Sequence, residues 1–401
     1  MPDGLKVIVM GGSLGGLTAA LTLRDIGCDV TVLERSRTPL ESRGAGIVLH
    51  PATVRYFIDN RVLALDEVST RADSLRYVNR EGSVVHEQPC SYRFTSYYTL
   101  HRGLLGAIDP DRYEMGVEVV DFDQVPSSVS VSLRDGASRR CDLLVAADGI
   151  GSTARRKLLP DVRPRYAGYV GWRGTVGPGD IQEETFERQR NAITYFVGRN
   201  THILTYPIPD FDGSVEPLRR RINFVWYVNV AEGAPLSDLL TDIKGVPRDL
   251  TVGPGAVQAR HVRALFEAAT STLPASLAEV VIKSREPFVQ VVFDVEVPRM
   301  AFGRVCLIGD AAFAIRPHAA AGTAKAAEDA WNLSAAVERT PGDVVEALAR
   351  WEGGQLALGQ QVLERARDIG DRSQFQGTYE PGDPYLAFGL YEPGDSFLTT
   401  Q

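Results

Sequence analysis

The sequence of 401 residues predicts an α/β fold, in which an inserted, mostly antiparallel sheet interrupts a domain built on parallel strands, and long helices follow at the C-terminal end. Three short apolar segments indicate the parallel strands, because each runs into a glycine turn: residues 6–10, 141–147 and 303–308. Residues 193–229, by contrast, alternate apolar and polar side chains with the period of strands. We therefore expect a discontinuous domain of residues 1–165 and 280–375, a β-sheet domain of residues 166–279, and a C-terminal arm of residues 376–401.

Composition and charge exclude several classes of protein. Hydrophobic residues make up 44% of the chain, enough for a large core, and the formal net charge of −8 argues against a nucleic-acid partner or an anionic membrane surface. The four cysteines have no paired spacing, as is typical of reduced thiols in the cytoplasm. The first ten residues predict a strand rather than a signal peptide, and no apolar run approaches the roughly 20 residues of a membrane span. We expect a cytoplasmic protein without stable membrane association.

The first glycine turn has the pattern of a Rossmann-like dinucleotide-binding unit. Gly11 permits a sharp turn after the strand, and Gly16 lets the following helix pack closely on it. The middle position of G-x-G-x-x-G is Ser13, which is small and carries a hydroxyl that can donate to a phosphate; Leu14 follows it. Glu34 ends the second strand about 18 residues after Gly16, close to the offset expected of the acid that binds a ribose hydroxyl. A purely structural turn is the alternative, and the loop alone does not distinguish FAD from NAD.

Two further strand-to-turn elements each carry one carboxylate. Asp148 and Gly149 follow the middle strand, and Asp310 follows Gly309 after the last one. Asp310 is suited to accept hydrogen bonds from ribityl or ribose hydroxyls, and the helix that begins beyond it offers free N–H groups to an oxyanion. Its first residues complete the predicted cofactor contacts: Ala320, Ala321, Gly322, Thr323 and Ala324. An ordinary strand-turn-helix joint is the alternative here.

Together these three spaced elements resemble the group A flavoprotein aromatic hydroxylases, typified by p-hydroxybenzoate hydroxylase, over essentially the whole chain. The resemblance implies that the loop at Gly11 binds the ADP half of FAD, that the Asp148 element serves FAD and NAD(P)H, and that Asp310 binds the ribityl chain. It also implies a Rossmann-like FAD-binding domain and a substrate-binding role for the inserted sheet. Arg102 occupies a position that contacts FAD in this family, with a solvated arginine as the alternative. Arg43 is a weaker candidate, and Arg35 is expected to flank the adenosine ribose.

Departures from the general family pattern point to a subgroup. Phe313, Ala320 and Ala324 stand where the family usually has histidine, glycine and asparagine. The same departures are typical of the dihydroxypyridine-type hydroxylases, which this sequence also resembles in residues 166–174 and 316–322. Trp172 and Arg173, in the first of these segments, are expected to pack at the domain junction.

The resemblance implies a single-component FAD monooxygenase that uses NAD(P)H and O2. In this chemistry a flavin C4a-hydroperoxide hydroxylates an electron-rich hydroxypyridine or phenol, which reacts best when its hydroxyl is ionised. We expect a small aromatic substrate, no metal, and a homo-oligomer, a dimer or larger. Two alternatives stay open: a tailoring hydroxylase of natural products that acts on a larger substituted pyridinol or phenol, and a flavin-binding protein without hydroxylase turnover.

Three residues are candidates for contact with the substrate. His318 lies in the loop expected to pass the flavin ring, and its imidazole is suited to a proton relay. His202 and Tyr206 share one face of a predicted strand, with Tyr195 and Tyr227 on neighbouring strands. A loop histidine bonded to backbone, and aromatic side chains that only fill the core, are the alternatives.

Overall fold

The computed structural model describes residues 4–38 and 46–396 and confirms the predicted α/β class. Its first sheet has six strands in the order β17-β18-β10-β1-β2-β6, and all neighbours are parallel except β17 and β18. The central strands are buried on both faces, which explains their continuous apolar sequences. The strands are β1 (Lys6–Met10), β2 (Asp29–Glu34), β6 (Tyr113–Met115), β10 (Leu143–Ala146), β17 (Ala301–Phe302) and β18 (Val305–Leu307).

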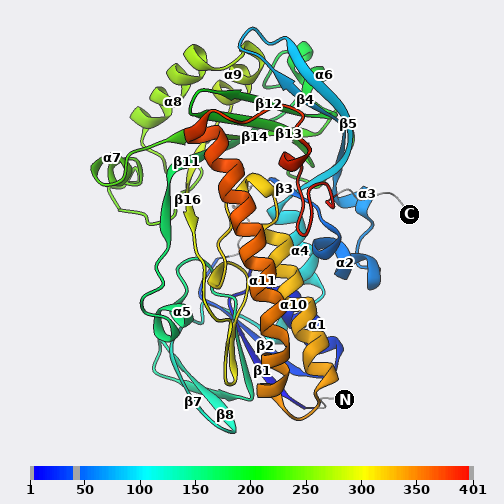
Figure 1. The fold of residues 1–401 in the computed structure, drawn as a ribbon, viewed down its shortest axis with the longest axis vertical. Helices are drawn as coiled ribbons and strands as arrows, with labels where there is room; N and C mark the ends of the chain where they lie inside the picture. The colour runs from blue at the N-terminus through cyan, green and yellow to red at the C-terminus, as the bar shows by residue number, and fades with distance from the viewer. Residues whose placement is uncertain (1–3, 39–45, 397–401) are drawn as a thin grey trace.

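Three helices lie side by side next to β1 and β2: α1 (Leu14–Asp25), α10 (Gly322–Arg339) and α11 (Val344–Asp371) (Figure 1). Small residues bring α1 and α10 close together, since a Cβ on Gly15 would lie 3.0 Å from the Cβ of Ala326. Ser334 of α10 also donates a hydrogen bond of 2.9 Å to the carbonyl of Thr22. The glycine loop and the loop before α10 are therefore held at the same end of this helix layer.

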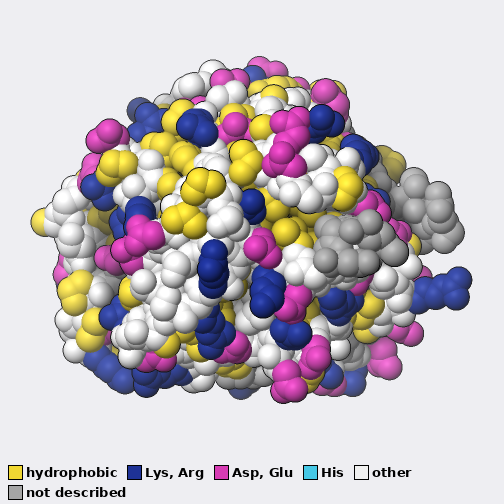
Figure 2. All heavy atoms as spheres, turned by 90° about the horizontal axis from the view of Figure 1, so that it is seen from below, with side chains coloured by type: hydrophobic (Ala, Val, Ile, Leu, Met, Phe, Trp, Pro, Cys, Tyr) yellow, Lys and Arg dark blue, Asp and Glu magenta, His cyan; other side chains and the backbone are white. Residues whose placement is uncertain are grey.

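A three-stranded sheet joins the same core from the other side, where Phe122, Val129 and Val131 pack with the six-stranded sheet. Its strands are β7 (Val119–Val125), β8 (Ser128–Leu133) and β9 (Ser138–Cys141), and the short helix α5 (Thr153–Leu158) lies beside them. Figure 2 shows basic and acidic side chains interspersed on the face seen from below, as is typical of a solvated surface. Among the described helices, none combines the length and apolar character that a membrane crossing requires.

The second large sheet has nine strands and extends beyond residues 166–279. Its order is β15-β16-β11-β14-β13-β12-β4-β5-β3, antiparallel except between β12 and β4. Strands from the predicted insert are β11 (Arg165–Val176), β12 (Ala192–Gly198), β13 (Thr201–Ile208), β14 (Arg221–Asn229) and β15 (Thr251–Val252). Strands from outside it are β3 (Gly46–Val48), β4 (Thr70–Val78), β5 (Val84–Ser96) and β16 (Phe288–Asp294). Local sequence patterns do not reveal pairing between strands that come from distant segments. The limits of the two domains stay a prediction.

The two faces of the nine-stranded sheet have different partners. Trp172, Phe224 and Trp226 lie on the face covered by helices of the insert. Tyr169, Tyr195 and Tyr227 lie on the opposite face, toward the C-terminal arm and the loop before α10. The covering helices are α6 (Glu183–Gln189), α7 (Ala234–Leu239), α8 (Ala259–Thr272) and α9 (Ala275–Ile282), and α2 (Pro51–Asp59), α3 (Leu65–Val68) and α4 (Tyr97–Gly106) connect the outer strands.

After α11 the chain makes one π-helical turn (Arg372–Gln376) and returns across the molecule as an arm that contains a single short 3-10 helix (Pro384–Leu386) in its described part. The N–H of Phe388 donates to the hydroxyl of Tyr92 at 3.2 Å, and the N–H of Gly389 donates to the carbonyl of Ala319 at 3.1 Å. These bonds fasten the arm to β5 and to the loop before α10.

A fully buried ion pair stabilises the last glycine turn. Lys325 and Asp329 of α10 are both 0% exposed and pair one helical turn apart. The second carboxylate oxygen of Asp329 accepts the N–H of Gly309 at 2.9 Å, so the pair also holds the turn that carries Asp310. Burial raises the pKa of Asp329, and Lys325 opposes this shift.

We expect Asp329→Ala to lower the free energy of unfolding by about 3–5 kcal/mol, because it leaves a buried lysine without a counter-ion. Urea unfolding at neutral pH measures this difference. Glu328→Ala, which removes a partly exposed carboxylate from the neighbouring position, should lower it by less than about 1 kcal/mol. The double variant Lys325→Met/Asp329→Ala should recover part of the loss, and equal losses for Asp329→Ala and Glu328→Ala would contradict the role of the pair.

Candidate active site

The backbone of the first glycine loop leaves no space for side chains. A Cβ on Gly16 would lie 1.9 Å from the carbonyl oxygen of Gly11, and a Cβ on Gly11, whose φ is +106°, would lie 2.4 Å from the carbonyl oxygen of Ala147. Ser13 is the N-cap of α1, but its side chain does not cap the helix and no acid lies in the first turn. The N–H groups at the start of α1 are therefore available to phosphate oxygens.

The other predicted residues of this loop have partners within the protein. The hydroxyl of Ser13 is hydrogen-bonded to that of Tyr97 at 2.7 Å, and Leu14 is buried as the first residue of α1. Glu34 is 7% exposed, and its two oxygens accept the N–H of Gly12 at 2.8 Å and of Ser36 at 2.7 Å. Glu34 thus fixes the shape of the loop, and each oxygen retains a lone pair for a further donor.

The structure gives less information on the three arginines that were predicted to contact the cofactor. Arg35, directly after β2, and Arg102, on α4, are both exposed side chains. Arg43 lies outside the described residues. A cofactor role for all three stays a prediction.

Asp148 and Gly149 form the second turn, at the carboxyl end of β10. One oxygen of Asp148 accepts the N–H of Thr153 at 2.6 Å, while the other oxygen is buried and has no hydrogen-bond partner in the described part of the chain. Burial raises the pKa of this carboxyl, and its hydrogen bonds to backbone N–H groups oppose the shift. Gly149 adopts a φ of +77°, which favours glycine. An orphaned acceptor at a strand end is suited to a ligand that carries hydroxyl or N–H groups.

Asp310 is the exposed carboxylate of the third turn, between the buried residues Gly309 and Ala311. Solvent reaches its side chain, but surrounding protein desolvates the carboxyl and raises its pKa to about 6, with Arg155 opposing the shift. Gly309 has a φ of +56°, and a Cβ there would lie 3.0 Å from the Cβ of Ala326. The turn therefore presents a solvent-accessible carboxylate at the same end of the sheet as the glycine loop.

Arg155, which the sequence analysis did not single out, links two of the three turns. It is 1% exposed, and its guanidinium donates to the carbonyl of Ala311 at 2.9 Å, to that of Asp310 at 3.3 Å and to that of Ile150. It joins the second and third turns directly. Its place shortly after Asp148 was visible in the sequence, but the carbonyls that it meets come from a distant segment.

The residues predicted to begin the last helix do so. Ala321 is the N-cap of α10 and Gly322 its first residue, followed by Thr323 and Ala324, with neither a side-chain cap nor an acid in the first turn. Ala320 has a φ of +55°, the left-handed conformation in which glycine is favoured. Its carbonyl accepts a hydrogen bond of 2.9 Å from Nε2 of the buried His50.

These features together fit FAD. Two uncapped helix starts offer N–H groups, Asp148 offers a carboxylate oxygen without a partner among the described residues, and Asp310 offers a solvent-accessible carboxylate. The N–H groups are suited to bind pyrophosphate oxygens, and the two carboxylates are suited to bind ribose and ribityl hydroxyls.

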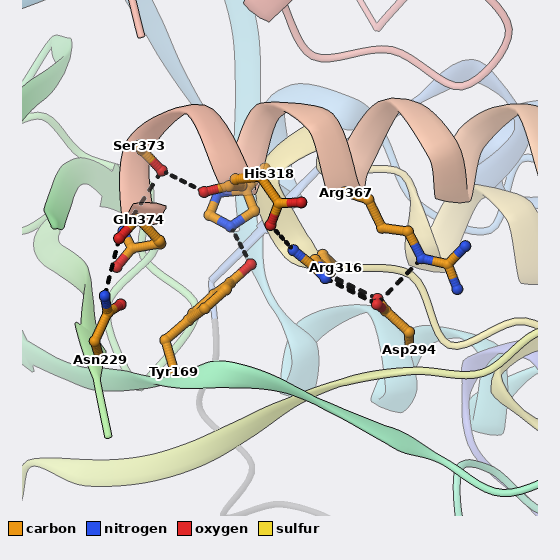
Figure 3. A network of polar contacts seen from close by, with 10 residues as sticks. Tyr169, Asn229, Asp294, Arg316, His318, Arg367, Ser373 and Gln374 are labelled. Carbon is orange, nitrogen blue, oxygen red and sulfur yellow. Dashed lines mark hydrogen bonds and ion pairs between the residues drawn. The ribbon is translucent and has the colours of Figure 1, made fainter. Parts of the chain in front are cut away.

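A cluster of rings lies between the nine-stranded sheet and the loop before α10. His202 of β13 has ring neighbours at centroid distances of 5.3–5.7 Å, namely Tyr195, Tyr227, Tyr379 and His318. Nε2 of His318 is hydrogen-bonded to the hydroxyl of Tyr169 at 2.8 Å, and Figure 3 shows the two side chains pointing toward each other from the loop and β11. The structure thus brings His202 and His318 together from positions 116 residues apart.

Unpaired polar atoms distinguish this cluster from an ordinary aromatic core. Both ring nitrogens of His202 and Nδ1 of His318 are buried without a hydrogen-bond partner among the described residues. Desolvation lowers the pKa of His202 to about 3 and that of His318 well below its usual value, with His202 and Arg316 adding to the second shift. Both imidazoles are therefore neutral at physiological pH, each with one donor and one acceptor.

Both the hydroxyl and the ring of Tyr206, the third candidate, have partners within the protein. Its hydroxyl donates to the carbonyl of Gly46 at 3.0 Å, and its ring stacks on Phe94 at a centroid distance of 4.4 Å. A contact between Tyr206 and the substrate stays a prediction.

Tyr379 is a member of the cluster that the sequence analysis did not single out, because it lies in the irregular arm. Its hydroxyl is 3.3 Å from that of Tyr77, and its ring covers His202.

Comparison with known proteins decides the family. Matches were found to models described as FAD binding domain-like (residues 166–294), pyridine nucleotide-disulphide oxidoreductase (residues 6–49) and FAD binding domain (residues 261–346). The 2,6-dihydroxypyridine 3-monooxygenase of Paenarthrobacter nicotinovorans is 39% identical, over 96% of this chain and 95% of that protein. The chain belongs to the group A FAD-dependent aromatic hydroxylases.

Other comparisons agree with this family. The solved structure of 2,6-dihydroxypyridine-3-hydroxylase from Arthrobacter nicotinovorans superposes with a TM-score of 0.92 at 38% identity, over 98% of each chain. The 3-amino-4-hydroxybenzoate 2-monooxygenase of Streptomyces cremeus is 29% identical, over 92% of this chain and 87% of that protein. The aromatic hydroxylase described here is thus a monooxygenase whose cofactors are FAD and NAD(P)H, as the sequence predicted.

Asp310→Asn should separate FAD binding from stability. Because the ordinary pKa of 3.8 rises to about 6 in the folded protein, the ionised carboxylate destabilises the apoprotein, and this loss develops as the pH rises from about 4 to 6. We expect the variant apoprotein to melt at a higher temperature than wild type at pH 8 and at a similar temperature at pH 4. FAD titration, followed by flavin fluorescence, should show about ten-fold weaker binding or more.

Asp59→Asn, which alters an exposed carboxylate paired with Arg55 on α2, is the control and should change neither quantity. An Asp310→Asn variant that binds FAD as wild type does would remove Asp310 from the cofactor site.

Proposed function

We propose that this aromatic hydroxylase acts on a hydroxylated pyridine, and 2,6-dihydroxypyridine is the substrate that we expect. The observation that carries the proposal is the ring cluster, in which three imidazole nitrogens of His202 and His318 are buried and find no partner within residues 4–38 and 46–396. An unpaired buried polar group costs about 1–3 kcal/mol, so these nitrogens favour a bound ring with its own donors and acceptors. A hydroxypyridine has both, and the relative at 39% identity is named for this substrate class.

The cluster supports a single-ring substrate. Tyr379 from the arm packs over His202, and its hydroxyl lies near that of Tyr77, so the side of the cluster toward the arm is closed. This arrangement favours a small hydroxypyridine or phenol over the tailoring alternative, a pyridinol with a long side chain. The burial of His202 and His318 limits the access of water to them, which favours an oxygen-transfer reaction.

Bound FAD, reduced by NAD(P)H, supplies the activated oxygen atom. The residues that would hold FAD are the glycine loop, Glu34, Asp148, Asp310 and the first residues of α10. His202 would orient the substrate ring through its two free nitrogens. His318 would contact a substrate hydroxyl through Nδ1 while Tyr169 fixes its other nitrogen and so the orientation of the ring.

Two properties of the whole protein belong to the same proposal. We propose a cytoplasmic location, which the four free cysteines support. A homo-oligomer, a dimer or larger, is the state that we expect, and light scattering of the purified holoenzyme measures it.

Substrate-stimulated oxidation of NAD(P)H tests the function. Purified holoenzyme should oxidise NADH or NADPH faster with 2,6-dihydroxypyridine than without it, and the product should gain one oxygen atom by mass. The same assay with 2-hydroxypyridine and 3-hydroxybenzoate defines the breadth of the site. Oxidation that none of these compounds stimulates would favour a flavin-binding protein without hydroxylase turnover.

His202→Phe and His318→Phe should each lower kcat/KM by about 100-fold or more, since they remove hydrogen bonds to the reacting ring. Because the pKa of His202 is about 3 and that of His318 is also lowered, both imidazoles stay neutral, and neither should produce an inflection in kcat/KM between pH 5.5 and 8. His261→Phe, remote on α8, is the control. A wild-type inflection near pH 6.5 that disappears in His318→Phe would contradict the neutral state.

A further inference from the structure

Arg173 has a position and an environment that packing at a domain junction does not explain. It lies on β11, where alternation places Tyr169, Gly171 and Arg173 on one face and Val170 and Trp172 on the other. The first face is the one that carries the ring cluster. Arg173 lies directly opposite Val225 on β14, two residues from Tyr227, whose ring leans within 3.4 Å of a Cβ built on Gly171.

Arg173 lacks a counter-ion among the residues that the structure describes. Its side chain is partly buried, its Nε is fully buried without a partner, and no described residue accepts a hydrogen bond from it or forms an ion pair with it. Two other arginines that border this face are neutralised. Arg221 lies 3.6 Å from a carboxylate oxygen of Asp210, and Arg316 lies 2.9 Å from one of Asp294 (Figure 3).

The tyrosines and histidines that the structure describes on this face are neutral. Burial raises the pKa of Tyr206 to about 12 and that of Tyr227 further, while Arg173 opposes both shifts and so lies within electrostatic range of both hydroxyls. Tyr169 also has a raised pKa, and the pKa values of His202 and His318 are lowered. A permanent cation among neutral hydrogen-bonding groups is unfavourable unless an anion joins it.

We propose that Arg173 binds the oxyanion of the substrate ring, so that a hydroxypyridine or phenol enters the active site already ionised. This inference rests on the proposed function, since it assumes that the ring cluster is the substrate site. The O–H bond breaks before binding: the proton remains with bulk water, and the electron pair stays on the ring oxygen. No protein group then has to act as a strong base, which agrees with the neutral histidines, and the ring arrives in its electron-rich form.

Ligand binding to the oxidised holoenzyme without NAD(P)H tests this inference. Ultraviolet spectra of bound 2,6-dihydroxypyridine across a pH series report the pKa of its hydroxyl, which we expect to lie at least one unit below that of the free compound, equivalent to ten-fold tighter binding of the anion. Arg173→Met should remove this shift and weaken binding about ten-fold or more, whereas Arg173→Lys should retain part of it. Binding of 2,6-dimethoxypyridine, which has no ionisable hydroxyl, should change less than about two-fold.

Arg221→Met is the matched control, because it removes an arginine of the adjacent strand that already has a carboxylate partner; it should behave as wild type. Three results would overturn the proposal: equal weakening of the ionisable and the methylated ligand by Arg173→Met, weakened FAD binding with unchanged ligand binding, or wild-type enzyme that binds the neutral hydroxyl form. Flavin fluorescence of each variant measures FAD binding, which tests the second of these results, and it also reports whether the variant is folded.

Failure of the proposed function has a separate signature. Wild-type enzyme that neither binds nor oxidises 2,6-dihydroxypyridine would overturn the hydroxypyridine assignment, and 4-nitrophenol, whose ionisation changes its visible spectrum, then replaces it in the same comparison. A lowered pKa of bound 4-nitrophenol that depends on Arg173 would support the oxyanion site alone. Absence of binding by both compounds would overturn both proposals.

Discussion

The guanidinium of Arg155 connects the turn at Asp148 with the turn at Asp310, although Asp310 lies 162 residues further along the chain. It donates only to main-chain carbonyls, so its charge is not cancelled by a direct carboxylate partner, and it offsets part of the desolvation that raises the pKa of Asp310. Lys325 and Asp329 hold the same turn from the other side through the N–H of Gly309. The directions in which Asp148 and Asp310 present their oxygens depend on this buried network, and no single strand or helix determines them.

The substrate side of the molecule follows a different principle. The cofactor side has charged groups fixed by backbone, whereas the ring cluster consists of neutral imidazoles and phenols drawn from β11, β12, β13, β14, the loop before α10 and the arm. Burial enforces this neutrality by lowering the pKa values of the histidines and raising those of the tyrosines. One uncompensated charge, that of Arg173, therefore has a large effect on which ionisation state of a ligand is bound.

Sequence patterns predicted those parts whose signal is local. Gly11 and Gly16 are dictated by close contacts at the first glycine turn, and the alternation that placed His202 and Tyr206 on one face of a strand needs only neighbouring residues. Patterns did not predict that His318 would meet His202, that Tyr379 would cover it, or that β4 would join the sheet of the insert, because these contacts link distant segments. Arg173 was placed at a domain junction for the same reason: its lack of a partner is a property of the folded neighbourhood.

Ala320 shows how a departure from the family pattern is accommodated. The left-handed conformation costs a non-glycine residue roughly 1–2 kcal/mol, yet alanine occupies it where the general family has glycine. Its methyl group packs against the sheet face that carries the ring cluster, and its carbonyl is held by His50. Because His318 lies two residues before it and Ala319 accepts the N–H of Gly389 from the arm, the same contacts that offset the strain also limit the freedom of His318. A glycine here would relieve the strain and remove the methyl contact, so the alanine favours a fixed loop beside the substrate over a relaxed one.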